Sequence, residues 1–313
     1  MSKSLEDKLD KIPIINILVR LFKGIKLPGL EGLSFYDLLE LYITGIVRGA
    51  LTTRASAIAF SFFMAIFPFL LFVLIVIPEI PIDNFQKEFM DFLESFLPPS
   101  TSDFFFQNIF ENIENSQRGG LLSSVFVLSI ALMANGVNAV FSGFENSYHE
   151  QLTRNAIRQY LYALGIALIL AFLLIITIAV LGYFQIYIVE GLLDALQNRG
   201  YEIESNSVIW TDVVKYIFFV IMVYLATATL YYFGTKEGRD SKFFSIGALF
   251  TTLLIILTSF LFGIYIENFG QYNKLYGSIG ALLILMFYLW LNSNILLLGY
   301  ELNASLNNLR KRC

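Results

Sequence analysis

Long apolar stretches alternate with short polar segments along most of the chain, and this pattern predicts six membrane-spanning helices. A helix needs about 20 residues to cross the roughly 30 Å hydrocarbon core of a bilayer, and each apolar stretch is that long. A β-barrel would give short segments of alternating hydrophobicity instead, so the pattern favours an all-α integral membrane protein. The predicted spans are residues 55–78, 119–144, 159–189, 213–234, 243–266 and 275–302.

Two further segments have a helical pattern but do not resemble spans. Residues 35–51 place their apolar side chains on one helical stripe, which predicts an amphipathic helix lying in the membrane interface. Residues 79–118 carry eight acidic residues and two short amphipathic stretches, so we expect a helical outer loop. We interpret this loop as a cap on the bundle, with a docking surface for an envelope protein as the alternative. The predicted organisation is an N-terminal segment 1–53, a transmembrane domain 54–304 and a basic tail 305–313.

The composition agrees with a membrane protein. Of the 313 residues, 57% are hydrophobic and only 15% are charged, whereas a soluble domain carries about 25% charged residues. The net charge of −4 gives no indication of nucleic-acid binding. The single cysteine is Cys313, which excludes an internal disulfide and a cysteine-based metal site. A long charged segment precedes the first span, which we therefore expect to act as an uncleaved signal anchor.

The distribution of Lys and Arg predicts the orientation of the chain. Sixteen of these residues fall in residues 1–54, in the connections after the second and fourth spans and in the tail. Only four fall in the other connections, and Lys215 lies at the edge of the fourth span. Because basic residues are retained on the inner side of the membrane, both termini are predicted to be cytoplasmic.

Polar residues within the spans are the main candidates for function, because polar side chains are costly in hydrocarbon. Asn138 and Glu145 lie seven residues apart in the second span, and Asn294 and Glu301 have the same spacing in the last span. Seven residues are about two helical turns, so each pair shares one face and each Asn lies about 10 Å deeper than its Glu. Arg54, at the entry to the first span, is predicted to lie at the depth of the two Glu residues.

These depths predict a polar cluster at the cytoplasmic boundary, in which Arg54 or Arg48 faces Glu145 and Glu301. The asparagines would line a route above the cluster. The alternative is a structural clasp, since asparagines often form hydrogen bonds between membrane helices. The residues predicted to form a polar binding cavity are Arg54, Asn138, Glu145, Asn292, Asn294 and Glu301.

The first span combines small residues with a proline. Ala55 and Ala59 lie four residues apart, as do Ala57 and Ser61, and this spacing allows helices to approach closely. Pro68 removes a backbone donor in the middle of the span, so we expect a kink and a hinge there. An ordinary membrane proline on a packing helix is the alternative.

The sequence gives little support for catalysis. Its one histidine, His149, falls in a predicted cytoplasmic loop, and "YHEQLTR" is not the HExxH signature of zinc proteases. A nucleophile elbow, a P-loop and a GxGxxG motif are all absent from the sequence. We therefore predict no catalytic residue, no metal site and no cofactor. A membrane enzyme that uses only carboxylates is the remaining enzymatic alternative.

Three segments carry a family resemblance. The segment "RASAIAFSFFMAIFPFLLF" (54–72) begins with an Arg-Ala turn and has a central Phe-Pro, and "NGVNAVFSGFENSY" (135–148) has an Asn before a polar-aromatic run. The segment "YGSIGALLILMFYLWLNSNILLLGYELNA" (276–304) ends in Gly-x-Glu-Leu-Asn. Together they resemble the YihY / virulence factor BrkB family of bacterial inner-membrane proteins. Two residues depart from the family pattern: Tyr300, where Ala is commoner, and Phe144, where an aliphatic residue or Asn often stands.

The resemblance implies a six-helix protein with both termini inside the cell and links to envelope integrity, serum resistance and transport of lipids or lipid-linked molecules. Our leading interpretation is a transporter or lipid-handling protein, with membrane lipids and a lipid or small-molecule substrate as partners. The alternative is an envelope scaffold whose working surface is the outer loop 79–118. Some family members carry an old ribonuclease label, but an acidic chain with one histidine gives no support for a nuclease.

Overall fold

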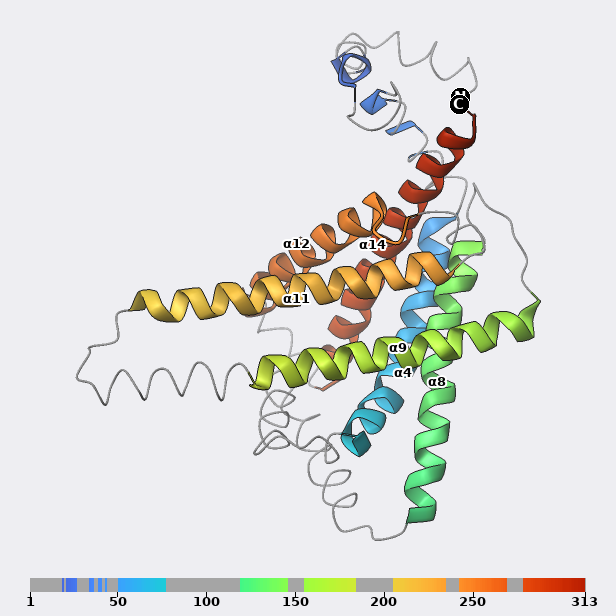
Figure 1. Ribbon diagram of the computed structural model, residues 1–313, viewed down its shortest axis with the longest axis vertical. Coiled ribbons are helices and arrows are strands. Elements are labelled where there is room, and N and C mark those ends of the chain that lie inside the picture. Colours follow the sequence, from blue (N-terminus) through green and yellow to red (C-terminus); the bar gives the residue numbers. More distant parts are fainter. Residues whose placement is uncertain are drawn as a thin grey trace.

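The apolar stretches of the sequence form six long helices (Figure 1). Helices suit an apolar environment because they satisfy their backbone hydrogen bonds internally. All six are long and apolar enough to cross a membrane, and the described part of the chain contains no strand, only an isolated bridge between Lys26 and Ser34. The helices are α4 (Leu51–Val76), α8 (Gly119–Glu145), α9 (Ala156–Tyr183), α11 (Ser205–Gly234), α12 (Ile246–Asn268) and α14 (Ser278–Arg312).

The computed structural model describes residues 19, 21–26, 34–36, 39–40, 43, 50–76, 119–145, 155–183, 205–234, 242–268 and 278–312. The predicted outer loop 79–118 lies outside the described residues, as do His149 and Arg48. Of the predicted amphipathic helix 35–51, residues 35, 36, 39, 40 and 43 are helical, whereas Ala50 is a turn with a φ of 46° and Leu51 already belongs to α4.

The six predicted spans correspond to the six helices, with different ends. α4 begins at Leu51, so Arg54 lies inside the helix and not before it. α14 continues to Arg312, and most of the predicted tail 305–313 is therefore helical. At 1.5 Å per residue its 35 residues extend about 52 Å, well beyond the hydrocarbon core.

The helices form a closed ring in which each helix packs mainly against two others, with further contacts across the ring. The order around the ring is α4, α8, α9, α11, α12, α14 and back to α4. α4 and α8 run side by side, whereas α9 crosses α8 at a steep angle (Figure 1). α4 is helical through Pro68, and its second half turns away from the direction of its first half (Figure 1), as expected where a proline removes a backbone hydrogen bond.

The buried core lies toward one end of the ring, which we call the junction end. Here α4 and α12 begin and α8 and α11 end. The buried side chains of α11 begin at Thr227, those of α12 end at Thr252, and those of α14 run from Ser293 to Leu306. α4 contributes Ala55 and Ala59 to this core, but Ala57 is exposed, so only one of the two predicted rows of small residues is a packing face.

Two glycines allow α12 and α14 to cross closely at the junction end. A Cβ atom added at Gly299 would lie 2.6 Å from the Tyr231 hydroxyl oxygen and 2.8 Å from the Gly247 carbonyl oxygen. Real Cβ atoms essentially never come within 3.0 Å of another heavy atom. This crossing therefore requires glycine at position 299.

Replacing Gly299 by Ala should destabilise the protein by about 1–3 kcal/mol, the usual cost of overpacking a core. Thermal unfolding in detergent, followed by circular dichroism, measures the effect. Gly165→Ala in α9 is the matched control, because a Cβ at that position meets nothing within 4 Å. Equal losses in the two variants would contradict the close crossing.

Candidate functional site

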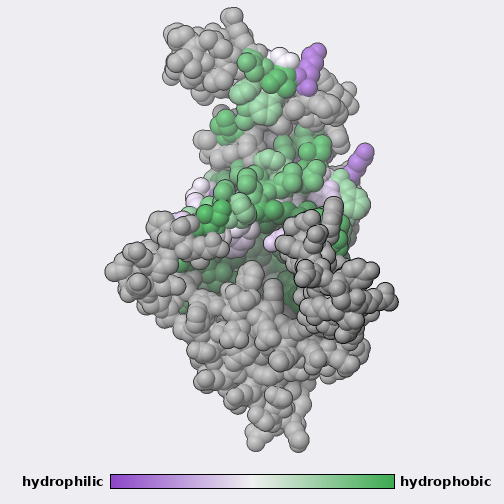
Figure 2. All heavy atoms as spheres, turned by 90° about the vertical axis from the view of Figure 1, so that its left-hand side faces the viewer, coloured by the Kyte–Doolittle hydropathy of each residue, from purple (hydrophilic) through white to green (hydrophobic). Residues whose placement is uncertain are grey.

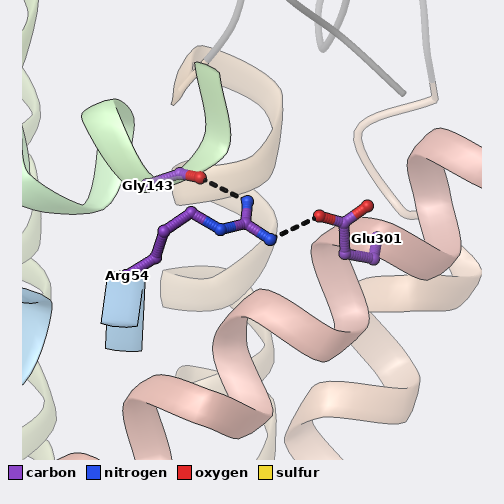
Figure 3. A network of polar contacts seen from close by, with 3 residues as sticks. All are labelled: Arg54, Gly143 and Glu301. Atoms are coloured by element: carbon purple, nitrogen blue, oxygen red, sulfur yellow. Dashed lines mark hydrogen bonds and ion pairs between the residues drawn. The ribbon is translucent and has the colours of Figure 1, made fainter. Parts of the chain in front are cut away.

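Arg54 joins three helices at the junction end. It lies in the first turn of α4, and its guanidinium points between α8 and α14 (Figure 3). Its Nη2 donates to Oε1 of Glu301 at 2.7 Å, and its Nη1 donates to the carbonyl oxygen of Gly143 at 2.8 Å. The side chain of Arg54 is 9% exposed and that of Glu301 is 0% exposed. We call Arg54, Gly143 and Glu301 the clasp.

The bond to Gly143 gives a hydrogen-bond partner to a carbonyl group at the end of α8. Gly143 lies in the last turn of α8, where the final four carbonyl groups have no partner within the helix. A cation at this position also interacts favourably with the negative end of the helix dipole. The guanidinium therefore caps α8 with one nitrogen and pairs with α14 through another.

The clasp constrains the fold because its charges are out of water. Moving an ion into a protein interior costs several kcal/mol, and a charge-assisted hydrogen bond offsets that cost only while both partners are present. With Glu301 fully buried, either charge alone would be strongly destabilising. The pair thus specifies how α4 and α14 align more than it adds stability.

Tyr300, next to Glu301, contacts α8, whereas Glu301 pairs with α4. Its ring stacks on that of Phe144, with centroids 4.1 Å apart and planes 11° from parallel. Tyr231 of α11 meets both rings edge-on, at centroid distances of 5.5 and 5.9 Å. Room for Phe144 depends on Gly234, where an added Cβ would lie 2.6 Å from the Phe144 ring.

Asn303 completes the motif by capping α12. Its Oδ1 accepts a hydrogen bond from the backbone N–H of Gly247 at 2.8 Å, and its Nδ2 donates to Oγ of Ser245 at 2.8 Å. Ser245 in turn accepts from the N–H of Ala248 at 3.2 Å. Two of the otherwise unpaired N–H groups in the first turn of α12 are thereby satisfied.

Two of the predicted asparagines bond to their own helix. Asn292 and Asn294 donate through Nδ2 to the carbonyl groups of Tyr288 and Trp290 in their own helix, at 2.9 and 2.7 Å. Asn138 is half-buried within α8, and Glu145 is half-buried at its last residue. The structure therefore brings Arg54 and Glu301 together and leaves the asparagines apart.

Sequence reasoning missed several residues of the junction. The Tyr231 hydroxyl donates to the carbonyl of Leu296 and shares a second hydrogen bond with Oγ1 of Thr251, both at 2.6 Å. Gln159 of α9 donates to Ser142 of α8 at 3.0 Å. Tyr and Thr are ordinary residues of apolar helices, so the sequence does not single out Tyr231 and Thr251. Their role becomes apparent only from the partners that the fold gives them. Asn303 could have been chosen from the sequence, since it is the last residue of the Gly-x-Glu-Leu-Asn motif.

The contacts at the junction end join helices to one another. In the ranges described above, no group of three or more His, Cys, Asp or Glu residues could hold a metal ion. The guanidinium and the carboxylate bond to each other within the core. The chemistry available here is hydrogen bonding and charge pairing.

Comparison with known proteins identifies relatives along nearly the whole chain. The profile of the family described as "Virulence factor BrkB" matches residues 43–312. A ribonuclease-like protein of Bacillus subtilis, YfkH, is 24% identical over 266 residues, which cover 83% of this chain and 91% of that protein. A UPF0761 membrane protein of Aggregatibacter aphrophilus is 23% identical, with 84% and 89% covered. One of Psychrobacter is 23% identical over 88% of this chain and 50% of its own length. No solved structure gives a significant match.

Replacing Arg54 by Met should destabilise the protein by about 3–5 kcal/mol, because Glu301 is then buried without its cation. Replacing Glu301 by Leu in the same chain should recover much of that loss, since no charge stays buried. Chemical unfolding in mixed micelles measures both values. Thr53→Met, one residue earlier and exposed, controls for the added methionine. A double variant no more stable than Arg54→Met would refute the pairing.

The Tyr300–Phe144 stack should appear as a coupling energy in a double-mutant cycle. We expect Tyr300→Ala and Phe144→Ala to be non-additive by about 0.5–1.5 kcal/mol, the usual range for aromatic pairs. Pairing Tyr300→Ala with Phe60→Ala, at an exposed position on α4, should give additive losses. Additivity in both cycles would mean that the stack contributes nothing specific.

Proposed function

Because the chain belongs to the virulence factor BrkB family and its relatives include several named as membrane proteins, we propose that it is a lipid-handling protein of the bacterial inner membrane, with a role in maintaining the envelope. Both termini face the cytoplasm in this proposal, as the distribution of Lys and Arg predicts. The junction end is then the cytoplasmic end of the bundle.

The observation that carries the proposal is the contrast between the two ends of three helices. Away from the junction end, no residue is buried on any face of 213–226 in α11, 253–265 in α12 or 282–292 in α14. We call these ranges the distal segments. α9, by comparison, buries a continuous stripe through Ala163, Ile166, Ala167, Ala171 and Ile175.

This contrast matters because a helix that only borders lipid still buries its inward face. The distal segments expose apolar side chains, among them Phe219, Leu257 and Phe287, and their remaining residues are half-buried. Figure 2 shows one such face, where most of the described surface is hydrophobic. Acyl chains are the apolar material that a bilayer supplies to such surfaces, and in this proposal they enter between the distal segments.

A bound amphiphile also needs partners for its polar head. In this proposal, polar groups on the distal segments provide them. Ser259 and Tyr288 share a hydrogen bond of 2.6 Å between α12 and α14. One turn further along α14, Oδ1 of Asn292 is buried and accepts no hydrogen bond within the protein. A buried acceptor without a partner costs about 1–3 kcal/mol. A hydroxyl or amide of a bound lipid-linked molecule would offset that cost.

The clasp has a supporting role in this proposal. It holds α4, α8 and α14 together at the cytoplasmic end, so that the distal segments separate from a fixed base. Any driven transport would need an ion gradient or a partner protein. The proposed role requires no covalent chemistry, metal or cofactor, and no nucleic acid.

An envelope scaffold is the second candidate, and one observation favours it. Arg54 and Glu301 bond to each other and not to an open cavity, as expected if the intramembrane polar residues serve only to join helices. In that case the working surface would be the predicted outer loop 79–118, with an envelope protein as its partner.

Native mass spectrometry of the protein, purified from membranes in mild detergent, tests the proposal. We expect the wild type to retain a lipid or lipid-linked molecule. Asn292→Leu should reduce the retained fraction by about tenfold, since one hydrogen bond of roughly 1.4 kcal/mol is lost. Glu301→Gln should lower stability with little effect on retention.

Asn294→Leu is the matched control, because Asn294 makes the same bond to its own helix and its Oδ1 is not among the buried atoms without a partner. This variant should retain the ligand. Equal loss in both variants would remove Asn292 from the binding surface. A wild type with no retained molecule would favour the scaffold.

A further inference from the structure

A short segment before the first span is folded back on itself. The backbone N–H of Phe35 donates to the carbonyl of Ile25 at 2.9 Å, next to the bridge between Lys26 and Ser34. The rings of Phe22 and Phe35 meet edge-on with centroids 5.2 Å apart. We call residues 21–26 and 34–36 the N-terminal clip, which lies at the top of Figure 1, near the end of α14.

The clip exposes apolar side chains outside the six spans. Leu21 is 56% exposed and Ile25 is 44% exposed, whereas Tyr36 is 9% exposed. Large exposed side chains on the spans are explained by lipid, but these two belong to none of the candidate spans. The hydrocarbon core of the bilayer therefore does not account for their exposure.

The charge of the clip is positive. Its described residues include two cations, Lys23 and Lys26, both exposed, and no acidic residue. The ammonium of Lys23 lies 4.9 Å from the centre of the Tyr36 ring, a geometry typical of a cation–π contact. In Figure 2 the hydrophobic surface at the top of the molecule adjoins strongly hydrophilic side chains. Apolar side chains interleaved with lysines match the composition of segments that lie in a membrane interface.

We propose that the N-terminal clip docks on the acidic surface of the membrane that the protein itself spans. Leu21 and Ile25 enter the boundary between head groups and acyl chains. Lys23 and Lys26 stay at the level of the lipid phosphates, with their aliphatic stems along the apolar boundary. This docking follows from the charge and exposure of the clip in a membrane-resident protein, and it is independent of the proposed lipid-handling role.

A fluorescent probe at position 21 tests the docking in the full-length protein. Cys313 is the only cysteine, so Cys313→Ser with Leu21→Cys gives a single labelling site for an environment-sensitive dye. The protein is placed in lipid nanodiscs of phosphatidylcholine, with or without about one third phosphatidylglycerol, and with spin-labelled lipids as quenchers. We expect quenching about twofold stronger in the acidic discs, because basic side chains are attracted to an anionic surface.

Charge reversal separates specific docking from general attraction. Lys26→Glu should reduce the quenching in acidic discs to about the level found in neutral discs, since it reverses a clip charge. Lys242→Glu is the matched control, because Lys242 is also exposed but lies before α12, and it should leave the quenching unchanged. Lys26 is chosen over Lys23 so that the contact with Tyr36 stays intact.

Three results would overturn the proposal. The first is that spin-labelled lipids do not quench the probe. The second is that the quenching is equal in neutral and acidic discs. The third is that quenching occurs only when a disc holds two copies of the chain. The last would assign the clip to contact between copies. Repeating the measurement with Ile25→Cys guards against a local effect of the label, and both positions are expected to agree.

Discussion

A guanidinium and a carboxylate buried inside an apolar bundle must pair with each other, and this requirement determines how the helices align at the junction end. Arg54 bonds to Glu301 and to the open end of α8, so one side chain determines the positions of three helices. Because water is excluded from Glu301, a shifted alignment of α4 and α14 would leave a buried charge unpaired. The penalty falls on the wrong arrangements, which makes the pair a source of specificity.

The motif Gly299 to Asn303 is specific because α14 is surrounded at this level. Successive residues of a helix point about 100° apart, so adjacent positions of the motif meet different helices, whereas positions 299 and 303, four residues apart, both meet α12. Gly299 allows α12 to approach, Tyr300 stacks on α8, Glu301 pairs with α4, and Asn303 caps the start of α12. Few other residues satisfy these contacts together, whereas a lipid-facing position accepts most apolar side chains.

The sequence was sufficient for the spans and for one long-range contact. Hydrophobic length predicts helices in a membrane with little ambiguity. Matching depths grouped Arg54 or Arg48 with Glu145 and Glu301, and the observed Arg54–Glu301 pair is one of the contacts that this grouping allowed. The asparagines are different, because an Asn can bond to a carbonyl four residues earlier in its own helix, as Asn292 and Asn294 do. Spacing alone cannot distinguish that bond from one between helices. The ring order and the role of Tyr231 depend on packing, which hydropathy does not encode.

The two departures from the family pattern explain each other. Tyr300 stands where Ala is commoner and Phe144 where an aliphatic residue or Asn often stands, yet the two rings stack against each other. A large ring at 300 needs a flat partner on α8, and Gly234 leaves the room that Phe144 requires. These aromatic contacts at the junction end are additional to the clasp. A bundle whose distal segments bury no core of their own depends on that end for its alignment, and two adjacent, unrelated interactions hold it there.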